Sequence, residues 1–276
     1  MSAGLPFSKE SWDSLPLSTL ARIERLATGT ETATDLYWAE PWRLMEQTPD
    51  PWQSQALDQL IIQQQDLLIL ASRQIGKTTV VAAAAYLEAC LGGFVLIISP
   101  SDDQSKEFFQ RLKGYHDRLQ LVEAVEDPTQ HQLRLANGGR ALALPNNERT
   151  VRVYSAVSLL VIDEASRVPD ELFAAVSPML AVSHGRTALL STPFGRRGFF
   201  WDQWENGGER WKRHKIEWWK CPRLTEAFIE GERRKHGDAW IRQEFGTEFI
   251  DVISSPLDAE AFESLIDHGL QVVESW

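Results

Sequence analysis

The chain has 276 residues, of which 43% are hydrophobic and 24% charged, the composition of an ordinary globular protein. No apolar run approaches the roughly 20 residues of a membrane-spanning helix, and the N-terminus lacks the charged-then-apolar pattern of a signal peptide, so we expect a cytosolic protein. A formal net charge of −11 argues against a general nucleic-acid coat, because non-specific affinity for DNA comes from neutralising phosphates. Cys90 and Cys221 form neither a metal-binding nor a disulfide pattern, and we expect Cys90 in the core.

The first part of the chain predicts an appendage followed by an α/β pattern. Residues 1–50 predict an N-terminal helical appendage, and an alternation of helices and buried strands begins at residue 51. The first helix of this alternation starts with a proline, which favours a helix start. A buried strand, LLILA, then leads into a second helix, which the pair Gly92-Gly93 ends.

The same alternation continues along the chain to Pro193. The run FVLIISP predicts a buried strand, and the helix after it begins with a serine and two aspartates. Alternating apolar residues around the Asn-Gly-Gly of residues 137–139 predict a β-hairpin. The runs LLVID and TALLSTP predict two further buried strands, separated by a helix from Pro169 to Leu180. Strands that alternate with helices predict an α/β fold with a mainly parallel sheet covered on both faces.

Beyond Pro193 the pattern is weaker. It predicts a helix, an outer strand within residues 209–219, and a helical segment from Pro222 to Phe245. Six of the eleven tryptophans lie between residues 201 and 240. We expect them to pack in the core or at an interface, with stacking on nucleic-acid bases as the alternative.

The residues between the strand LLILA and its helix have the form of a phosphate-binding loop. They read SRQIGKTT, from Ser72 to Thr79. A loop of backbone N–H groups that leads into a helix N-terminus favours anionic phosphates. Lys77 would supply a positive charge for the β- and γ-phosphates, and Thr78 a hydroxyl for Mg²⁺.

The loop departs from the usual pattern at its opening. Ala71 occupies the place of a glycine, and alanine tolerates a positive φ poorly. We therefore expect a variant loop shape from which Arg73 and Gln74 project. Taken alone, the Gly-Lys-Thr could be a chance occurrence at a helix start.

A second motif argues against chance. The run LLVIDE predicts a buried strand that delivers Asp163 and Glu164 to one edge of the sheet. Asp163 could hold Mg²⁺, and Glu164 could orient the attacking water. Together the two motifs predict a protein that binds and hydrolyses a nucleoside triphosphate.

Four segments occur in an order that points to one family: Trp52-Gln53, SRQIGKTT, LLVIDEAS and LLSTP. Over about residues 51–250 the chain resembles the ATPase domain of the terminase large subunit, the DNA-packaging motor of tailed phages. An Arg-Gln pair inside the loop is rare among other P-loop proteins, and terminase loops do not keep the opening glycine. The resemblance implies a P-loop NTPase of the additional-strand, RecA-like type, with a mainly parallel sheet flanked by helices.

The resemblance also implies that ATP and Mg²⁺ bind at the matching positions. Gln53 would lie near the adenine, with a surface glutamine as the alternative. Thr78 and Asp163 would hold Mg²⁺, and Glu164 would position the water. The residues expected to bind the nucleotide are Gln53, Ser72, Gln74, Gly76, Lys77, Thr78 and Thr79.

We also expect at least one catalytic arginine, since an arginine finger contributes about 10³–10⁵ in rate. Arg73, in the loop, could act in cis. Arg152 lies just upstream of the acidic strand, where terminases often carry an Arg-Gly pair, and in a ring it would reach the neighbouring subunit's nucleotide. Val153 replaces that glycine here, and Arg149 competes for the role.

The strand LLSTP ends with a candidate coupling segment. In the family, Ser191 and Thr192 would couple the nucleotide state to DNA movement; the alternative is a turn that ends the strand at Pro193. The basic pair Arg196-Arg197 and the segment from Arg210 to Lys215 could touch DNA phosphates, or could form an ordinary solvated face.

The resemblance implies a place in a larger assembly. The expected partners are double-stranded DNA, a portal protein and the terminase small subunit, with self-association into a ring during packaging in the host cytoplasm. Full terminase large subunits continue into a nuclease domain. We expect residues 251–276 to be a linker or tail without that domain, and hence no DNA cleavage by this chain.

Two alternative functions remain open at this stage. A helicase-like translocase would use the same motifs but needs a second RecA-like domain. A non-hydrolysing nucleotide-binding assembly module would keep Lys77 but need neither Glu164 nor an arginine finger.

Overall fold

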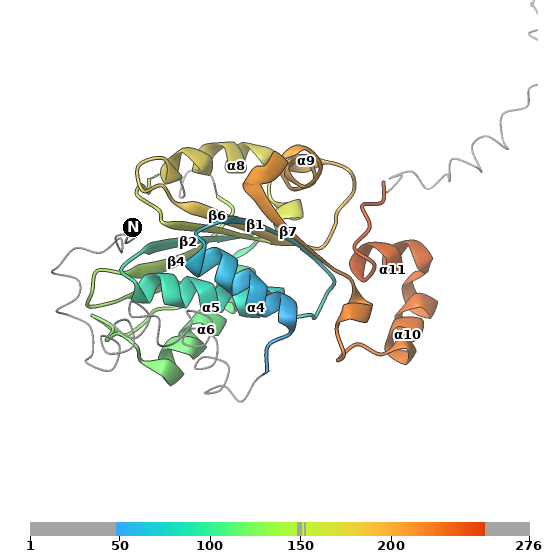
Figure 1. Ribbon diagram of the computed structural model, residues 1–276, viewed down its shortest axis with the longest axis horizontal. Coiled ribbons are helices and arrows are strands. Elements are labelled where there is room, and N and C mark those ends of the chain that lie inside the picture. Colours follow the sequence, from blue (N-terminus) through green and yellow to red (C-terminus); the bar gives the residue numbers. More distant parts are fainter. Residues whose placement is uncertain (1–47, 148–150, 152, 252–276) are drawn as a thin grey trace, which may run out of the picture.

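Figure 1 shows the computed structural model, which describes residues 48–147, 151 and 153–251. The appendage predicted over residues 1–50 and the tail predicted over residues 251–276 lie almost entirely outside this part of the chain. Within the described part, no helix combines the length and hydrophobicity needed to cross a membrane.

A seven-stranded sheet runs through the centre of the molecule (Figure 1). Its strand order is β3-β4-β2-β5-β6-β1-β7, and neighbouring strands pair in parallel except for β3 and β4. The strands are β1 (Asp66–Ala71), β2 (Phe94–Ser99), β3 (Gln132–Arg134), β4 (Arg140–Pro145), β5 (Leu159–Asp163), β6 (Arg186–Ser191) and β7 (Trp211–Ile216). The predictions of a mainly parallel sheet, of the hairpin and of the outer strand are confirmed.

Strand β6 lies between β1 and β5, so one strand separates the Gly-Lys-Thr loop from the Asp-Glu pair. Leu70 of β1 lies beside Ser191 of β6, and Leu190 lies beside Asp163 of β5. The carboxyl ends of these three strands therefore meet at one edge of the sheet, where open α/β sheets bind their ligands. The inserted strand confirms the additional-strand, RecA-like arrangement.

Helices cover both faces of the sheet, as predicted (Figure 1). One face carries α4 (Pro51–Leu57), α5 (Lys77–Cys90) and α6 (Asp102–Leu119), and the other carries α8 (Asp170–Val176) and α9 (Gly198–Asn206). The short helical pieces are the π-helix η1 (Asp58–Ile62) and the 3₁₀ turns η2 (Ala165–Arg167), η3 (Ser177–Leu180), η4 (Gly208–Arg210) and η5 (Trp218–Lys220). The predicted helix from Pro169 to Leu180 thus consists of an α-helix followed by a 3₁₀ turn.

Each face of the sheet buries its own apolar cluster. Leu67 and Ile69 of β1 belong to the cluster that includes α5 and α6. Leu68 and Leu70 belong to the cluster that includes α8 and α9. Successive side chains of a strand point to opposite faces, so a strand buried on both sides is apolar throughout. This explains why the strands appear in the sequence as continuous apolar runs.

The turn of the β3–β4 hairpin packs against the end of α5. The Nδ2 of Asn137 donates to the carbonyl oxygen of Cys90 at 2.7 Å, and its Oδ1 accepts from the Gly139 N–H at 3.0 Å. A Cβ on Gly139 would lie 1.8 Å from the carbonyl oxygen of Ala89. Only glycine allows this approach, so the hairpin is locked to the helix. Cys90 is buried and free, as expected.

The chain after β7 forms a small helical unit beside the end of the sheet (Figure 1). It contains α10 (Glu226–His236) and α11 (Asp238–Glu244). Its apolar cluster is built from Ile229, Ile241 and Phe245, and Trp218 and Trp240 pack against that cluster. These two tryptophans therefore pack in a core, as expected.

Candidate functional site

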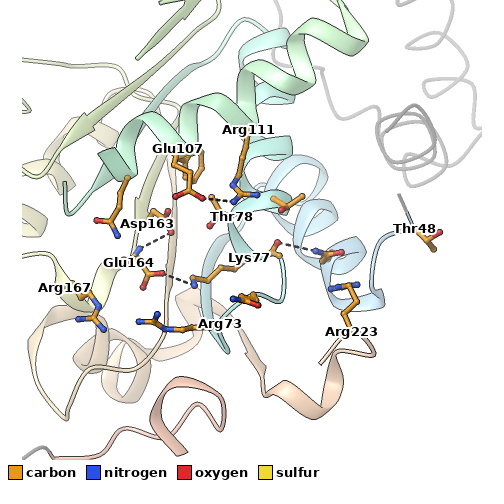
Figure 2. A pocket seen from close by; sticks show the side chains of 16 residues that line it. Thr48, Arg73, Lys77, Thr78, Glu107, Arg111, Asp163, Glu164, Arg167 and Arg223 are labelled. Carbon is orange, nitrogen blue, oxygen red and sulfur yellow. Dashed lines mark hydrogen bonds and ion pairs between the residues drawn. The ribbon is translucent and has the colours of Figure 1, made fainter. Parts of the chain in front are cut away.

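A pocket of about 990 Å³ opens at the carboxyl ends of β1 and β5 (Figure 2). This volume is at the upper end of the range for small-molecule sites, about 300–1,000 Å³. The predicted residues that line it are Gln53, Arg73, Gln74, Gly76, Lys77, Thr78, Thr79, Asp163 and Glu164. The two sequence motifs therefore share one cavity, although Arg73 and Asp163 are 90 residues apart in the sequence.

In the loop after β1, the alanine at the opening position does not adopt a positive φ. Ala71 ends the strand, and the positive φ angles fall instead on Gln74 (58°) and Gly76 (86°). An extended strand residue accepts an alanine without strain, so the opening glycine is not needed here. Arg73 and Gln74 are exposed, as expected from a loop that projects them.

Ser72 and Gln53 support the loop from inside the protein. Ser72 is fully buried, and its hydroxyl donates to the carbonyl oxygen of Arg73 at 3.2 Å, away from the pocket lining. Gln53 is buried rather than on the surface. Its Nε2 donates to the carbonyl oxygen of Gly76 at 3.2 Å, and its Oε1 accepts from the Asp50 N–H at 2.9 Å. Gln53 thus joins the start of α4 to the end of the loop.

Lys77 and Glu164 meet across the pocket. The Nζ of Lys77 lies 2.9 Å from the Oε1 of Glu164, and Figure 2 shows both side chains pointing to this contact. Glu164 adopts a left-handed backbone (φ 47°), and its N–H donates to the Oδ1 of Asp163 at 3.0 Å. The tight turn places two carboxylates side by side beneath the loop.

The two carboxyl groups have opposite pKa shifts. Burial, and then the charge of Glu164, raise the pKa of Asp163 above its ordinary value, although Lys77 opposes the shift. Burial would also raise the pKa of Glu164, but the charge and hydrogen bond of Lys77, followed by the charge of Arg167, lower it below its ordinary value. Glu164 is therefore compensated by cations, whereas Asp163 is a buried carboxyl that a further cation would stabilise.

The residues present fit a magnesium ion. Asp163 is a buried carboxyl whose pKa is raised by burial and by the charge of Glu164, and Thr78 brings a hydroxyl to the same pocket. Magnesium prefers such oxygen ligands, and in nucleotide sites it takes one or two carboxylates together with substrate phosphates. Within the described residues, no group of three or more His, Cys, Asp or Glu could hold a metal alone.

Residues 68–263, more than half of the chain, match the family described as "Terminase large subunit, T4likevirus-type, N-terminal". This chain belongs to that family. The match favours the terminase interpretation over the helicase-like alternative. Among curated proteins, no similar sequence is found.

Solved structures of phage large terminases have a similar fold. The ATPase domain of the large terminase of Thermus phage P74-26 is 19% identical, covers 76% of this chain and 97% of that domain, and gives a TM-score of 0.64. The HK97 bacteriophage large terminase is 17% identical, with 79% and 55% covered and a TM-score of 0.63. The large terminase of another thermophilic bacteriophage, solved in complex with ADP, is 11% identical, with 73% and 53% covered and a TM-score of 0.61. The chain thus spans about half the length of each of the last two proteins.

A hydrogen-bond network joins the terminase Asp-Glu motif to the end of β6. The Ser166 hydroxyl lies 2.7 Å from that of Ser191 and donates to the carbonyl oxygen of Thr192 at 2.9 Å. The Ser191 hydroxyl also donates to the Oε2 of Glu164 at 3.3 Å. Ser191 and Thr192 do not line the pocket, but Ser191 contacts a residue that does. The coupling role that the resemblance implied for Ser191 and Thr192 stays a prediction.

Of the three candidate catalytic arginines, the structure describes only Arg73. Arg73 lines the pocket, and its Nε contacts the Oε2 of Glu244 at 2.6 Å. Arg152 and Arg149 lie outside the described residues. Their roles in a terminase ring stay predictions.

Most of the basic segment after α9 has local structural partners. Arg210 pairs with Asp66 at 2.6 Å. Arg213 donates to the carbonyl oxygens at the end of α9, such as that of Trp204 at 2.9 Å. His214 is buried against Gln59, at 2.7 Å. These contacts favour a structural role for the segment over a DNA-binding one.

Several pocket residues escaped the sequence-based prediction. They are Thr48, Gln104, Glu107, Phe108, Arg111, Arg167 and Arg223. Arg167 follows the Asp-Glu motif by three residues, and this proximity is a usable signal. The residues of α6 face the pocket because that helix packs beside α5 (Figure 2). Arg223 has no motif around it, since only the path of the chain after β7 brings it to the pocket.

Proposed function

We propose that this terminase domain binds ATP with Mg²⁺ and hydrolyses it to ADP and phosphate, and that hydrolysis powers the movement of double-stranded viral DNA into a procapsid. The contact of Lys77 with Glu164 inside the pocket carries the proposal, because it joins the phosphate-binding and water-positioning residues in one site. The large terminase of the second thermophilic bacteriophage has been solved with ADP and with ATP-gamma-S, which supports the choice of nucleotide.

Lys77 and Glu164 change partners in the proposed reaction. A lysine ammonium that turns its donors to the β- and γ-phosphates shares its charge between the phosphates and Glu164, so its hold on Glu164 weakens. Nucleotide binding would therefore release the Glu164 carboxylate, which then orients the attacking water. The Ser191 hydroxyl, already 3.3 Å from Glu164, keeps the carboxylate in place.

Asp163 and Thr78 would hold the magnesium ion. The ion would neutralise charge that develops on the β- and γ-phosphate oxygens. Asp163 is rigid in this role because its Oδ1 also accepts the Glu164 N–H. Arg73, at the edge of the pocket, would add positive charge in cis, and Arg152 would add it to a neighbouring subunit's nucleotide.

Hydrolysis would be transmitted through the end of β6. A change at Glu164 alters its hydrogen bond to Ser191, and Ser191 is tied to Ser166 and through it to Thr192. In this proposal the domain works as a ring with DNA, the portal protein and the terminase small subunit, in the host cytoplasm.

The substitution Glu164→Gln tests the proposal. It keeps the shape of the side chain but removes the carboxylate that orients water. We expect ATP turnover to fall by about 100-fold or more, with binding of ATP-gamma-S retained. Glu205→Gln, on the exposed side of α9, is the matched control and should turn over ATP like the parent.

Two outcomes would contradict the proposal. Unchanged turnover in Glu164→Gln would remove Glu164 from the mechanism. A parent protein that binds ATP-gamma-S but shows no turnover at high protein concentration would be a non-hydrolysing nucleotide-binding module.

A further inference from the structure

One buried carboxylate holds two of the arginines that line the pocket. Glu244 is the last residue of α11, and its side chain is only 2% exposed. Its Oε2 lies 2.6 Å from the Nε of Arg73, and its Oε1 lies 3.5 Å from an Nη of Arg167. Glu244 itself does not line the pocket. Both arginines that it contacts do line the pocket.

Backbone contacts fix Glu244 against the loop. The Arg73 N–H donates to the Glu244 carbonyl oxygen at 3.1 Å, and the Trp218 N–H donates to the carbonyl oxygen of Phe245 at 3.1 Å. The Nε2 of Gln243 donates to the Oε1 of Glu244 at 3.1 Å. The carboxylate thus has little freedom to move relative to the loop.

Glu244 compensates the positive charge of the two arginines. Arg73 and Arg167 point toward one another at the same side of the pocket (Figure 2), and Lys77 is a third cation nearby. Like charges at one side of a pocket repel each other, although solvent weakens this repulsion because the side chain of Arg73 is 50% exposed. A carboxylate with one oxygen toward each arginine compensates that repulsion, through a hydrogen bond to Arg73 and an ion pair with Arg167.

Arg167 is also fixed from a second direction. Its guanidinium lies 4.4 Å from the centre of the Phe194 ring, a distance typical of a cation–π contact. Phe194 directly follows the segment Ser191-Thr192-Pro193. The charge of Arg167 also reaches Glu164, where it favours the ionised carboxylate and lowers its pKa. Arg167 therefore lies at the end of the pocket where the water-positioning residue is found.

We propose that Glu244 is a positioning residue for ATP hydrolysis: it holds Arg73 and Arg167 as a pair at the end of the pocket that receives the terminal phosphate. Arg73 contacts Glu244 through Nε, at the base of its fork, so the two Nη groups at the tip extend beyond the contact. Two guanidinium groups oriented before the substrate arrives stabilise developing charge without reorganisation. This inference rests on the proposed ATPase function.

A purely structural role makes a different prediction. If Glu244 only anchored α11 on the loop, its loss would loosen the whole pocket, and ADP and ATP-gamma-S would lose affinity together. A positioning role instead concerns the terminal phosphate, which ADP lacks. The ratio of the two affinities separates the two roles.

The experiment compares Glu244→Gln with Glu248→Gln and the parent. Glu248 lies four residues further on and also pairs with an arginine, Arg242 at 2.6 Å, so it controls for the loss of an ion pair in this region. For Glu244→Gln we expect ADP affinity within about twofold of the parent, ATP-gamma-S affinity lowered by about tenfold, and kcat lowered by about 10- to 100-fold. Glu248→Gln should match the parent in all three measurements.

A second pair of variants covers the case in which Glu244→Gln does not fold. Arg167→Gln should reproduce the same selective loss, whereas Arg197→Gln should not. Arg197 lies over the same Phe194 ring at 5.0 Å but does not contact Glu244. The comparison therefore isolates the arginine that Glu244 holds.

The outcomes separate this inference from the proposed function. Equal losses for ADP and ATP-gamma-S, or no loss in a folded Glu244→Gln or Arg167→Gln protein, would overturn the positioning role alone. A parent that binds neither nucleotide would overturn both the positioning role and the ATPase assignment.

Discussion

Both ends of the pocket have an arginine–carboxylate contact, but one carboxylate contacts a single arginine and the other contacts two. At one end, Arg223 makes a bidentate contact with Asp50, at 3.2 and 2.7 Å, and also approaches the carbonyl oxygen of Ile75 at 3.4 Å. At the other end, Glu244 is shared between Arg73 and Arg167. The Asp50–Arg223 contact uses most of the N–H donors of one guanidinium group. The Glu244 contacts use only part of the N–H donors of two guanidinium groups.

This difference matches what each end has to do. Asp50 caps α4 and, with Gln53, forms a capping box that places Gln53 against the loop. The Asp50–Arg223 pair therefore fixes the frame of the pocket. The shared carboxylate at the Glu244 end compensates two cations while keeping part of their hydrogen-bonding capacity for a ligand. We infer that a saturated pair serves structure and a shared carboxylate serves chemistry.

The largest expected effect is on turnover. Arg73→Ala removes a cation beside the proposed terminal phosphate, and we expect kcat to fall by about 10²–10³-fold. Arg223→Ala should instead raise KM by about tenfold and change kcat by less than about threefold, since uniform binding affects KM. Steady-state ATP hydrolysis measures both. Equal kcat losses in the two variants would remove the distinction between the ends.

The second effect is on stability. In the double variant Arg73→Ala/Arg167→Ala, Glu244 remains buried without its two cations, and we expect a loss of about 3 kcal/mol in the free energy of unfolding. Adding Glu244→Gln should recover part of that loss, because the amide carries no charge. Urea unfolding of the three proteins measures it. A triple variant no more stable than the double would show that the arginines stabilise by packing rather than by charge.

The smallest effect concerns the frame of the pocket. Gly76→Ala puts a Cβ at a φ of 86°, and the Cβ would lie 2.6 Å from the Nε2 of Gln53. The backbone strain alone costs about 1–2 kcal/mol. Combining Gly76→Ala with Gln53→Ala should relieve the clash but not the strain, so the double variant should lose less unfolding free energy than the two single variants together. Urea unfolding of the three variants measures this, and strict additivity would mean that Gln53 does not press on the loop.

Much of the fold was predictable because its signals are local. Continuous apolar runs identify strands buried on both faces, and the Asn-Gly-Gly turn identifies the hairpin. The loop and the Asp-Glu pair are also local, and the alternation with helices implies that their strands end at one edge. The proximity of Lys77 to Glu164 follows from that topology.

The unpredicted part of the site comes from contacts between distant segments. Neither Arg223 nor Glu244 lies in a recognisable motif, and the Arg73–Glu244 contact spans 171 residues. An acidic residue at the end of a short polar helix appears in the sequence as an ordinary solvated group. Its burial depends on what packs against it.

The sequence by itself determined the strands, the phosphate-binding loop, the acidic pair and the family to which they point, because each depends on residues that are neighbours in the chain. Only the tertiary structure decided which carboxylates hold the arginines. The parallel pairing of β7 with β1 brings the Ser72 N–H to the carbonyl oxygen of Ile216, so the chain after β7 emerges beside the loop. From there α11 can place Glu244 against Arg73 and Arg167, a position that no local pattern encodes.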